Sequence, residues 1–184
     1  MIVFHPLELY SVRAYLSAVR YDRSPPKDDR HLDDVWELKQ RIRREEGYLC
    51  QTWDFFSSAY ERNMAHVITE GGREEANGDG DGGVVGFAVV RSDGYILFLG
   101  VDPEYRGEGL GRELVERAGE DHDKLSCHTR ASNQNAVDFY EHLGFEVDRY
   151  VGSYYQNGED AKYMSRNEAA SLRSRISDAL TGED

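Results

Sequence analysis

Three glycines between a strand-like and a helix-like segment limit the fold of this chain more than any other feature. Gly107, Gly109 and Gly111 follow the apolar residues 95–101 and open an amphipathic pattern over residues 109–119. Glycine leaves the backbone accessible, so N–H groups at the positive end of the helix can converge on an anion such as a pyrophosphate. The spacing matches neither a Walker loop, which needs Gly-Lys-Ser/Thr, nor a dinucleotide fingerprint after the first strand of a βαβ unit. The segment therefore predicts a strand, a phosphate-binding loop and a helix in direct succession.

Apolar periodicity extends this unit to a whole domain. Helices wedged between strands predict an α+β fold with a mixed sheet covered on both faces, in α/β/α layers. Trp53, Phe56 and Tyr60 mark one short helix, and such aromatic residues are expected in the core rather than in a substrate groove. We expect a single domain over residues 1–165. The predicted strands cover residues 64–70, 84–91, 95–101, 125–130, 145–150 and 162–165, and the predicted helices lie near residues 32–46, 53–60, 109–119 and 133–143.

Three segments are harder to assign. Residues 7–18 suit a helix opened by Pro6, residues 12–21 suit a strand, and Ser24-Pro25-Pro26 ends either element. Residues 71–83 cannot supply a core and are expected to form a flexible loop, in which a calcium site fails because its twelfth position is Ala88. For residues 166–184, a docked helix, contact with a neighbouring chain and a free tail all stay open.

The chain is strongly acidic. Its 35 acidic residues against 22 basic ones give a formal net charge of −13, and only four of the basic residues are lysines. Such a surface repels nucleic acid and indicates a salt-adapted, halophilic proteome, with an ordinary acidic protein as the alternative. No apolar run approaches a membrane span and no signal peptide is evident, so we expect a soluble, cytoplasmic protein. Cys50 and Cys127 are expected to be free thiols, and no metal site is expected.

The glycine segment resembles the acetyl-CoA signature of the Gcn5-related N-acetyltransferase (GNAT) superfamily. Residues Val101-Asp-Pro-Glu-Tyr-Arg106-Gly-Glu-Gly109-Leu-Gly111 follow its pattern of Gln or Arg, two residues, Gly, one residue, and Gly or Ala. The resemblance implies a GNAT fold, with a mixed, mostly antiparallel sheet of about six or seven strands flanked by helices. It also implies acetyl-CoA as cofactor. The pyrophosphate would be held by the backbone of Arg106, Gly107, Glu108, Gly109, Leu110 and Gly111.

The same resemblance assigns roles to the residues on either side of the glycines. The strand end at Val101 would pair with the pantetheine arm and offer an N–H to the oxyanion. Gly107 stands where many relatives carry a second basic residue, so Arg106 and Arg112 would carry more of the binding.

A second stretch, Asn133-Gln-Asn-Ala136-Val-Asp-Phe139-Tyr140-Glu-His-Leu-Gly144-Phe145, resembles the second GNAT motif, in which a helix carries a tyrosine beside the thioester sulfur. The resemblance implies that Asn133, Ala136 and Tyr140 contact coenzyme A. A phenol can hand a proton to the departing thiolate at neutral pH, so Tyr140 is the candidate general acid. The alternative is a core tyrosine whose hydroxyl is satisfied.

The attacking amine needs a base. His128 lies on the predicted strand 125–130, and an imidazole titrates in the range suited to proton abstraction, directly or through a water. Cys127 cannot form a dyad with His128, because adjacent strand residues point to opposite faces. One eukaryotic N-terminal acetyltransferase type is similar in having a histidine here and a tyrosine on the preceding strand, which implies a pair of His128 with Tyr95. A structural histidine is the alternative, with Tyr95 or a water-linked carboxylate such as Glu159 as the base.

Residues Tyr154-Tyr155-Gln-Asn-Gly158-Glu159-Asp160-Ala161-Lys-Tyr-Met164 are similar to a pattern of RimI-like and archaeal N-terminal protein acetyltransferases. The resemblance implies that Tyr154 or Tyr155 closes over a peptide N-terminus; a surface hairpin turning at Gly158 is the alternative. We therefore expect direct acetyl transfer, in a ternary complex, to the N-terminal α-amine of a protein. A small-molecule amine or lysine side chain as acceptor, and a CoA-binding module without turnover, are the alternatives. A homodimer is left open.

Overall fold

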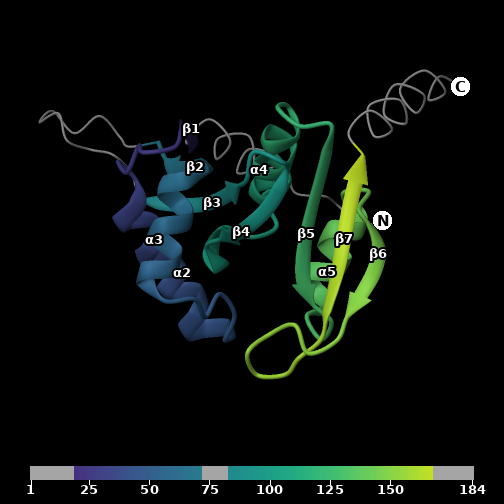
Figure 1. The fold of residues 1–184 in the computed structure, drawn as a ribbon. Helices are drawn as coiled ribbons and strands as arrows, with labels where there is room; N and C mark the ends of the chain where they lie inside the picture. The colour runs from purple at the N-terminus through teal and green to yellow at the C-terminus, as the bar shows by residue number, and fades with distance from the viewer. Residues whose placement is uncertain (1–18, 72–82, 168–184) are drawn as a thin grey trace, which may run out of the picture. The chain divides into compact units, whose positions relative to one another are not determined.

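Among the residues that the structure describes, seven strands form a sheet in the order β1-β2-β3-β4-β5-β7-β6. The computed structural model describes residues 19–71 and 83–167 (Figure 1). The strands are β1 (Val19–Ser24), β2 (Met64–Glu70), β3 (Val84–Val90), β4 (Tyr95–Val101), β5 (Lys124–Arg130), β6 (Glu146–Val151) and β7 (Ala161–Asn167). The helices are α2 (Leu32–Glu46), α3 (Trp53–Arg62), α4 (Leu110–Gly119) and α5 (Gln134–His142), with a 3-10 turn, η1 (Pro103–Tyr105), before α4.

The pairing of the strands confirms the predicted fold class. β4 pairs with β5 in parallel, whereas β1 with β2, β5 with β7 and β6 with β7 are antiparallel. The sheet is therefore mixed and mostly antiparallel, with helices beside it, as the α+β prediction requires. Over the described ranges, no helix has the length and apolar character needed to cross a membrane.

Local signals at the ends of elements account for most boundaries. Gly47 ends α2 with φ 74°, in the left-handed region that lets a helix stop at glycine. Asn133 caps α5, because its Oδ1 accepts the N–H of Ala136 at 3.1 Å. At the ambiguous start, the strand alternative is confirmed for residues 19–21, and β1 ends at Ser24 before the two prolines. The rest of that segment, residues 72–82 of the predicted loop and residues 168–184 of the tail lie outside the described residues.

Two compact units divide the described residues. The first holds residues 19–71, 83–89 and 98–114, and the second holds residues 90–97 and 115–167. The division passes through β3, β4 and α4 rather than through a linker. The single domain over residues 1–165 stays a prediction.

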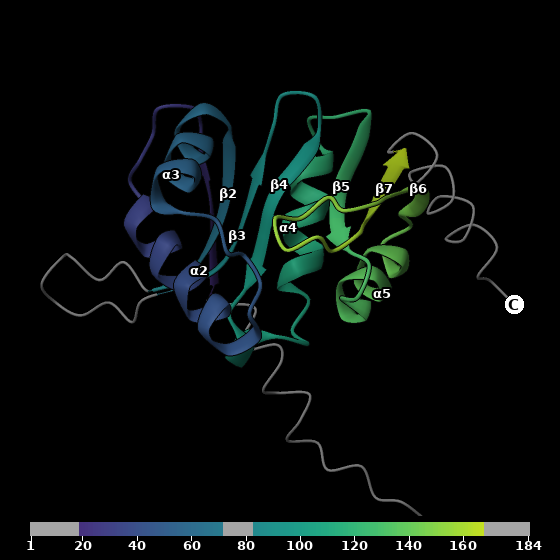
Figure 2. The same ribbon diagram turned by 60° about the horizontal axis from the view of Figure 1, so that its bottom comes forward.

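In the first unit, α2 and α3 pack around one aromatic side chain. Figure 2 shows the two helices together on one side of β2 and β3. Phe56 of α3 is fully buried, with its ring centroid 5.0 Å from that of Phe98 and 6.1 Å from that of Phe87. Tyr60 is also buried, so both aromatics belong to the core as predicted. Trp53 does not fit that prediction: it is 39% exposed, because it lies in the first turn of α3.

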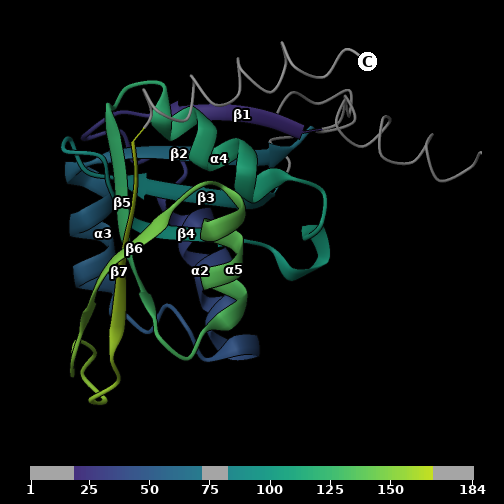
Figure 3. The ribbon, with the colours of Figure 1, turned by 90° about the vertical axis from the view of Figure 1, so that its right-hand side faces the viewer.

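In the second unit, β5 is the strand that organises its neighbours. It pairs with the first half of β4 at Tyr95↔Ser126 and Ile96↔Cys127, and with β7 along its whole length. Figure 3 shows β5, β7 and β6 side by side, with α5 along one face of them. The fully or nearly fully buried residues of this core include Leu125, Cys127, Val137, Tyr140, Phe145, Ala161 and Met164.

The turn before β4 gives a test of this second unit. Gly94 has φ 79°, and a Cβ there would lie 2.0 Å from the carbonyl oxygen of Lys124. We expect Gly94→Ala to lower the free energy of unfolding by about 2–5 kcal/mol, because backbone strain and a backbone clash add. Gly158→Ala is the matched control, since Gly158 has φ 80° and open space around its Cβ position, which leaves only the strain of about 1 kcal/mol. Urea unfolding measures both, and equal losses would contradict the close approach.

Candidate active site

A buried carboxylate fixes the corner where β4 ends, in the first unit. Asp102 is 2% exposed, and its Oδ1 accepts the N–H of Glu104 at 3.1 Å at the start of η1. The same carboxylate pairs with Arg41 of α2. The backbone N–H of Asp102 donates to the carbonyl oxygen of Val85 at 2.9 Å, which continues the β3–β4 pairing. The chain therefore enters the glycine loop from a fixed position.

The loop after this corner suits an anion. Gly107 and Gly109 have φ 83° and 85°, a conformation that side chains rarely adopt, and a Cβ at either position would meet no atom within 4 Å. These glycines therefore border open space next to the start of α4. Leu110 and Gly111 lie in the first turn of α4, where N–H groups find no acceptor within the helix. The residues present fit the pyrophosphate of coenzyme A that the sequence predicted here.

Arg106 makes contacts that the sequence did not predict. Its Nε and Nη2 each donate to the carbonyl oxygen of Val101 at 3.2 Å, and its Nη1 pairs with Glu46, the last residue of α2. Glu46 is 60 residues away in the sequence, so no local signal pointed to it. The assignments of Arg106 and Arg112 to coenzyme A stay predictions.

In the second unit, the predicted base and its partners come together. Tyr95 Oη lies 2.7 Å from Nδ1 of His128. Tyr154 stacks on the imidazole, with ring centroids 4.3 Å apart and planes inclined by 9°, and Tyr163 of β7 lies at 4.9 Å. Sequence reasoning named Tyr95, His128 and Tyr154 but missed Tyr163, which faces His128 across the β5–β7 register.

Burial sets the protonation states of this cluster. It lowers the pKa of His128 below its usual value, and the charge of Arg149 lowers it further, so the imidazole is neutral at pH 7. Burial, and then a hydrogen bond with Tyr154, raises the pKa of Tyr95 far above that of a free phenol. A protonated phenol beside a neutral imidazole can accept a proton at Oη while it passes its own to Nδ1.

Tyr140 lies on α5 with its hydroxyl against the thiol of Cys127. Burial is the main cause that raises the pKa of Tyr140 well above its usual value, and the neighbouring Cys127 raises it further. Burial also raises the pKa of Cys127 to about 12, and the hydrogen bond from Tyr140 partly offsets this. Both groups therefore keep their protons at neutral pH. The hydroxyl of Tyr140 thus has a hydrogen-bond partner, as the core alternative predicts. The same hydrogen bond shows that this hydroxyl can donate to a sulfur atom. The role of Tyr140 as general acid stays a prediction.

The hairpin that carries Tyr155 is held by an ion pair that sequence reasoning missed. Glu159 forms an ion pair with Arg130 and accepts a hydrogen bond from the hydroxyl of Ser132. Both hydrogen bonds lower the pKa of its carboxyl, and the one from Ser132 has the larger effect. Arg130 lies 4.1 Å from the ring centroid of Tyr155. Arg130 follows His128 by two residues on β5, and this spacing is the signal that places both on one face. The occupied carboxylate argues against Glu159 as the base.

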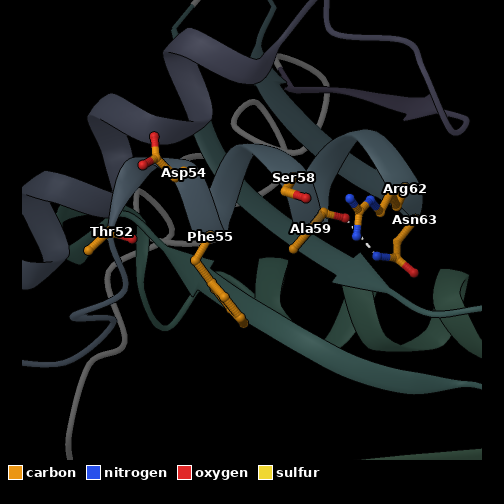
Figure 4. A pocket seen from close by; sticks show the side chains of 7 residues that line it. All are labelled: Thr52, Asp54, Phe55, Ser58, Ala59, Arg62 and Asn63. Atoms are coloured by element: carbon orange, nitrogen blue, oxygen red, sulfur yellow. Dashed lines mark hydrogen bonds between the residues drawn. The ribbon is translucent and has the colours of Figure 1, made fainter.

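A further hollow runs along α3 in the first unit, lined by Thr52, Asp54, Phe55, Ser58, Ala59, Arg62 and Asn63 (Figure 4). Phe55 is 56% exposed and meets Phe98 edge to face, with centroids 6.2 Å apart. None of the predicted site residues lines it. In the described part of the chain, no group of three or more His, Cys, Asp or Glu side chains is placed to hold a metal ion.

Comparison with known sequences gives the family. A model of the acetyltransferase (GNAT) domain matches residues 73–147. The putative (ribosomal protein bS18)-alanine N-acetyltransferase of Bacillus subtilis is 36% identical over 143 residues, which cover 72% of this chain and 87% of that protein. N-alpha-acetyltransferase 30 of Xenopus laevis is 41% identical over 73 residues, which cover 37% of this chain and 27% of that protein. The chain thus spans about a quarter of the length of that relative.

Comparison with solved structures agrees. The crystal structure of the ribosomal-protein-S18-alanine N-acetyltransferase from Escherichia coli superposes with a TM-score of 0.62 at 26% identity, covering 80% of this chain and 94% of that one. Arabidopsis thaliana Naa50, in complex with the bisubstrate analogue CoA-Ac-MVNAL, gives a TM-score of 0.63 at 20% identity, covering 82% and 99%, and shows the likeness of fold alone. With the Bacillus subtilis relative covered over most of its length, and with the strand order and glycine loop described above, the chain belongs to the GNAT family of acetyltransferases.

Proposed function

We propose that this chain transfers acetyl directly from acetyl-CoA to the N-terminal α-amine of a protein or peptide, in a ternary complex. The observation that carries the proposal is the stack of Tyr154 on His128, with Tyr95 at 2.7 Å from the same imidazole. Tyr154 is 45% exposed, so part of its side chain is open to a peptide next to a neutral proton acceptor. A peptide N-terminus held by Tyr154 would present its amine to this pair.

Acetyl-CoA, the cofactor of the family, supplies an acetyl group activated as a thioester. Backbone N–H groups of Gly107 to Gly111 would hold its pyrophosphate, since this loop combines open space with a helix start. Val101 would offer its backbone N–H at the end of β4, since its carbonyl oxygen already accepts from Arg106. Asn133 and Ala136, whose mutual hydrogen bond forms the first turn of α5, would lie along the cofactor as the second motif implies.

The protons balance with the residues available. Tyr95 and His128 would take the proton that the amine must lose, and Tyr140 would hold a proton at Oη for the departing sulfur. Cys127 is a poor nucleophile, because burial raises its pKa to about 12 and only a thiolate attacks effectively. This supports direct transfer rather than an acetylated Cys127.

The relatives support an N-terminal acceptor. The Bacillus subtilis protein is named for a ribosomal-protein alanine and the Xenopus laevis protein for N-alpha acetylation. Those names belong to those proteins. For this chain they favour a peptide α-amine over a polyamine or a lysine side chain.

An acceptor panel tests the proposal. We expect thiol release with short peptides that have a free N-terminus, and acetyl on the α-amine by mass spectrometry. The same peptides with a formylated N-terminus and an internal lysine are the matched controls, and they should give only background release. Turnover with polyamines, aminoglycosides or the blocked lysine peptides, and none with free N-termini, would contradict the proposal.

The base predicts a specific pH dependence. The lowered pKa of His128 keeps the imidazole neutral at pH 7, so the wild-type rate should fall only as the pH drops below the usual histidine range near 6.5. His128→Gln should lose rate most at neutral pH and regain part of it at alkaline pH, where the acceptor, with a pKa near 8, is already deprotonated. A pH–rate profile of kcat/KM measures this, with Tyr95→Phe as the partner variant. A variant profile of wild-type shape would make His128 structural.

The acid makes a separate prediction. Tyr140→Phe keeps the ring contact with Phe145, whose centroid lies 5.0 Å away, and removes only the proton donor. We expect kcat to fall by roughly 10² or more with the Kd for acetyl-CoA nearly unchanged, because the proton matters mainly in the transition state. Steady-state rates and calorimetric binding measure the two quantities. A wild-type kcat would show that another group protonates the sulfur.

A further inference from the structure

Arg106 occupies the signature position next to the glycine loop, but its guanidinium is turned back onto the chain. Nε and Nη2 donate to the carbonyl oxygen of Val101, both at 3.2 Å, and Nη1 pairs with Glu46. We propose that Arg106 is a positioning residue that caps the end of β4 for the pantetheine arm, with Glu46 holding its guanidinium in place, and that it is not a ligand of the pyrophosphate.

With this cap, the peptide group between Val101 and Asp102 is hydrogen-bonded at both of its ends. The N–H of Asp102 donates to Val85 of β3 at 2.9 Å, and the carbonyl of Val101, at the other end of the same peptide group, accepts from Arg106. In an antiparallel pair, successive residues direct their N–H and C=O groups to opposite edges of the strand. The N–H of Val101 therefore lies on the edge away from β3, beside its capped carbonyl. With the carbonyl satisfied, that N–H is the group this residue offers to a ligand.

Helix α2 holds the corner at two points of opposite charge. Arg41 pairs with the carboxylate of Asp102, and Glu46, at the end of the same helix, pairs with Arg106. The side chains of Arg106 and Glu46 are 44% and 26% exposed, and a partly exposed pair of this kind adds little stability. Its effect is instead to select the guanidinium orientation that reaches Val101.

A pyrophosphate does not need this guanidinium. Gly107 and Gly109 place backbone N–H groups and open space beside the start of α4, which is sufficient for an anion. The Val101 carbonyl and Glu46 occupy three of the five N–H donors of Arg106 and hold its guanidinium against β4 and α2. The backbone N–H donors, rather than the positive charge, are therefore what the protein uses.

The test separates the donor from the charge. Arg106→Gln keeps a side-chain N–H donor without charge, and Arg106→Met removes both. Each is compared on acetyl-CoA and on acetyl-pantetheine, which lacks the nucleotide and all phosphates. The Kd of each of these two acetyl donors, and the salt dependence of that Kd, are measured without an acceptor amine. The outcome is therefore independent of the proposed acceptor. The kcat/KM values with one acceptor peptide give a second readout.

We expect Arg106→Met to weaken the binding of acetyl-CoA and of acetyl-pantetheine by the same factor, roughly 10-fold for one lost charge-assisted hydrogen-bonding group. Arg106→Gln should recover most of this lost affinity. The slope of log Kd for acetyl-CoA against log salt should stay unchanged. Glu46→Gln keeps Arg106 and should weaken the binding of acetyl-CoA and of acetyl-pantetheine equally, but by a smaller factor than Arg106→Met. This variant also provides the test if Arg106→Met fails to fold. The opposite result would be an equal loss of affinity in Arg106→Gln and Arg106→Met that affects acetyl-CoA but not acetyl-pantetheine, with a shallower salt slope. That result would make Arg106 a phosphate ligand and overturn the proposal.

Discussion

Strand β4 is the constraint on which both units depend, because it supplies the candidate residues of each. Its first residue, Tyr95, reaches the imidazole of His128 at 2.7 Å in the second unit. Its last residue, Val101, carries the carbonyl that Arg106 caps in the first unit. The buried carboxylate of Asp102 follows directly and turns the chain into the glycine loop. The pairing of β4 with β5 at Tyr95 and Ile96 therefore fixes the first residue of the proton relay within the second unit.

Burial prepares the second unit for acid–base chemistry by one physical effect. Removal from water disfavours the charged form of every titratable group, so it lowers the pKa of His128 and raises those of Tyr95, Cys127 and Tyr140. The imidazole is left able to accept a proton, and the phenols are left able to give one. The thiol is left unreactive. At neutral pH, burial thus keeps the imidazole without its second proton and keeps the phenols and the thiol protonated.

Local chemistry made part of this arrangement predictable from the sequence. The glycine loop depends on residue type at a few adjacent positions. The pairing of Tyr95 with His128, 33 residues apart, was expected only from the resemblance to one type of N-terminal acetyltransferase. Contacts between distant segments were not predictable in this way. Arg41 meets Asp102, Arg106 meets Glu46, and Arg130 meets Glu159 across 61, 60 and 29 residues, and nothing local marks one arginine among many as a partner. Trp53 was misjudged because helical spacing does not say how far the first turn of α3 protrudes from the core.

The protonation state of His128 is the most direct test of its role as the base, since a base that is already protonated cannot accept the proton of an amine. NMR titration of the imidazole resonances in the free protein measures its pKa without any substrate. We predict a pKa below the usual 6.5 for histidine, because burial and Arg149 both disfavour the imidazolium. We also predict a changed pKa in Tyr95→Phe, which removes the phenol from Nδ1. A pKa at or above 7, unaffected by Tyr95→Phe, would contradict this role.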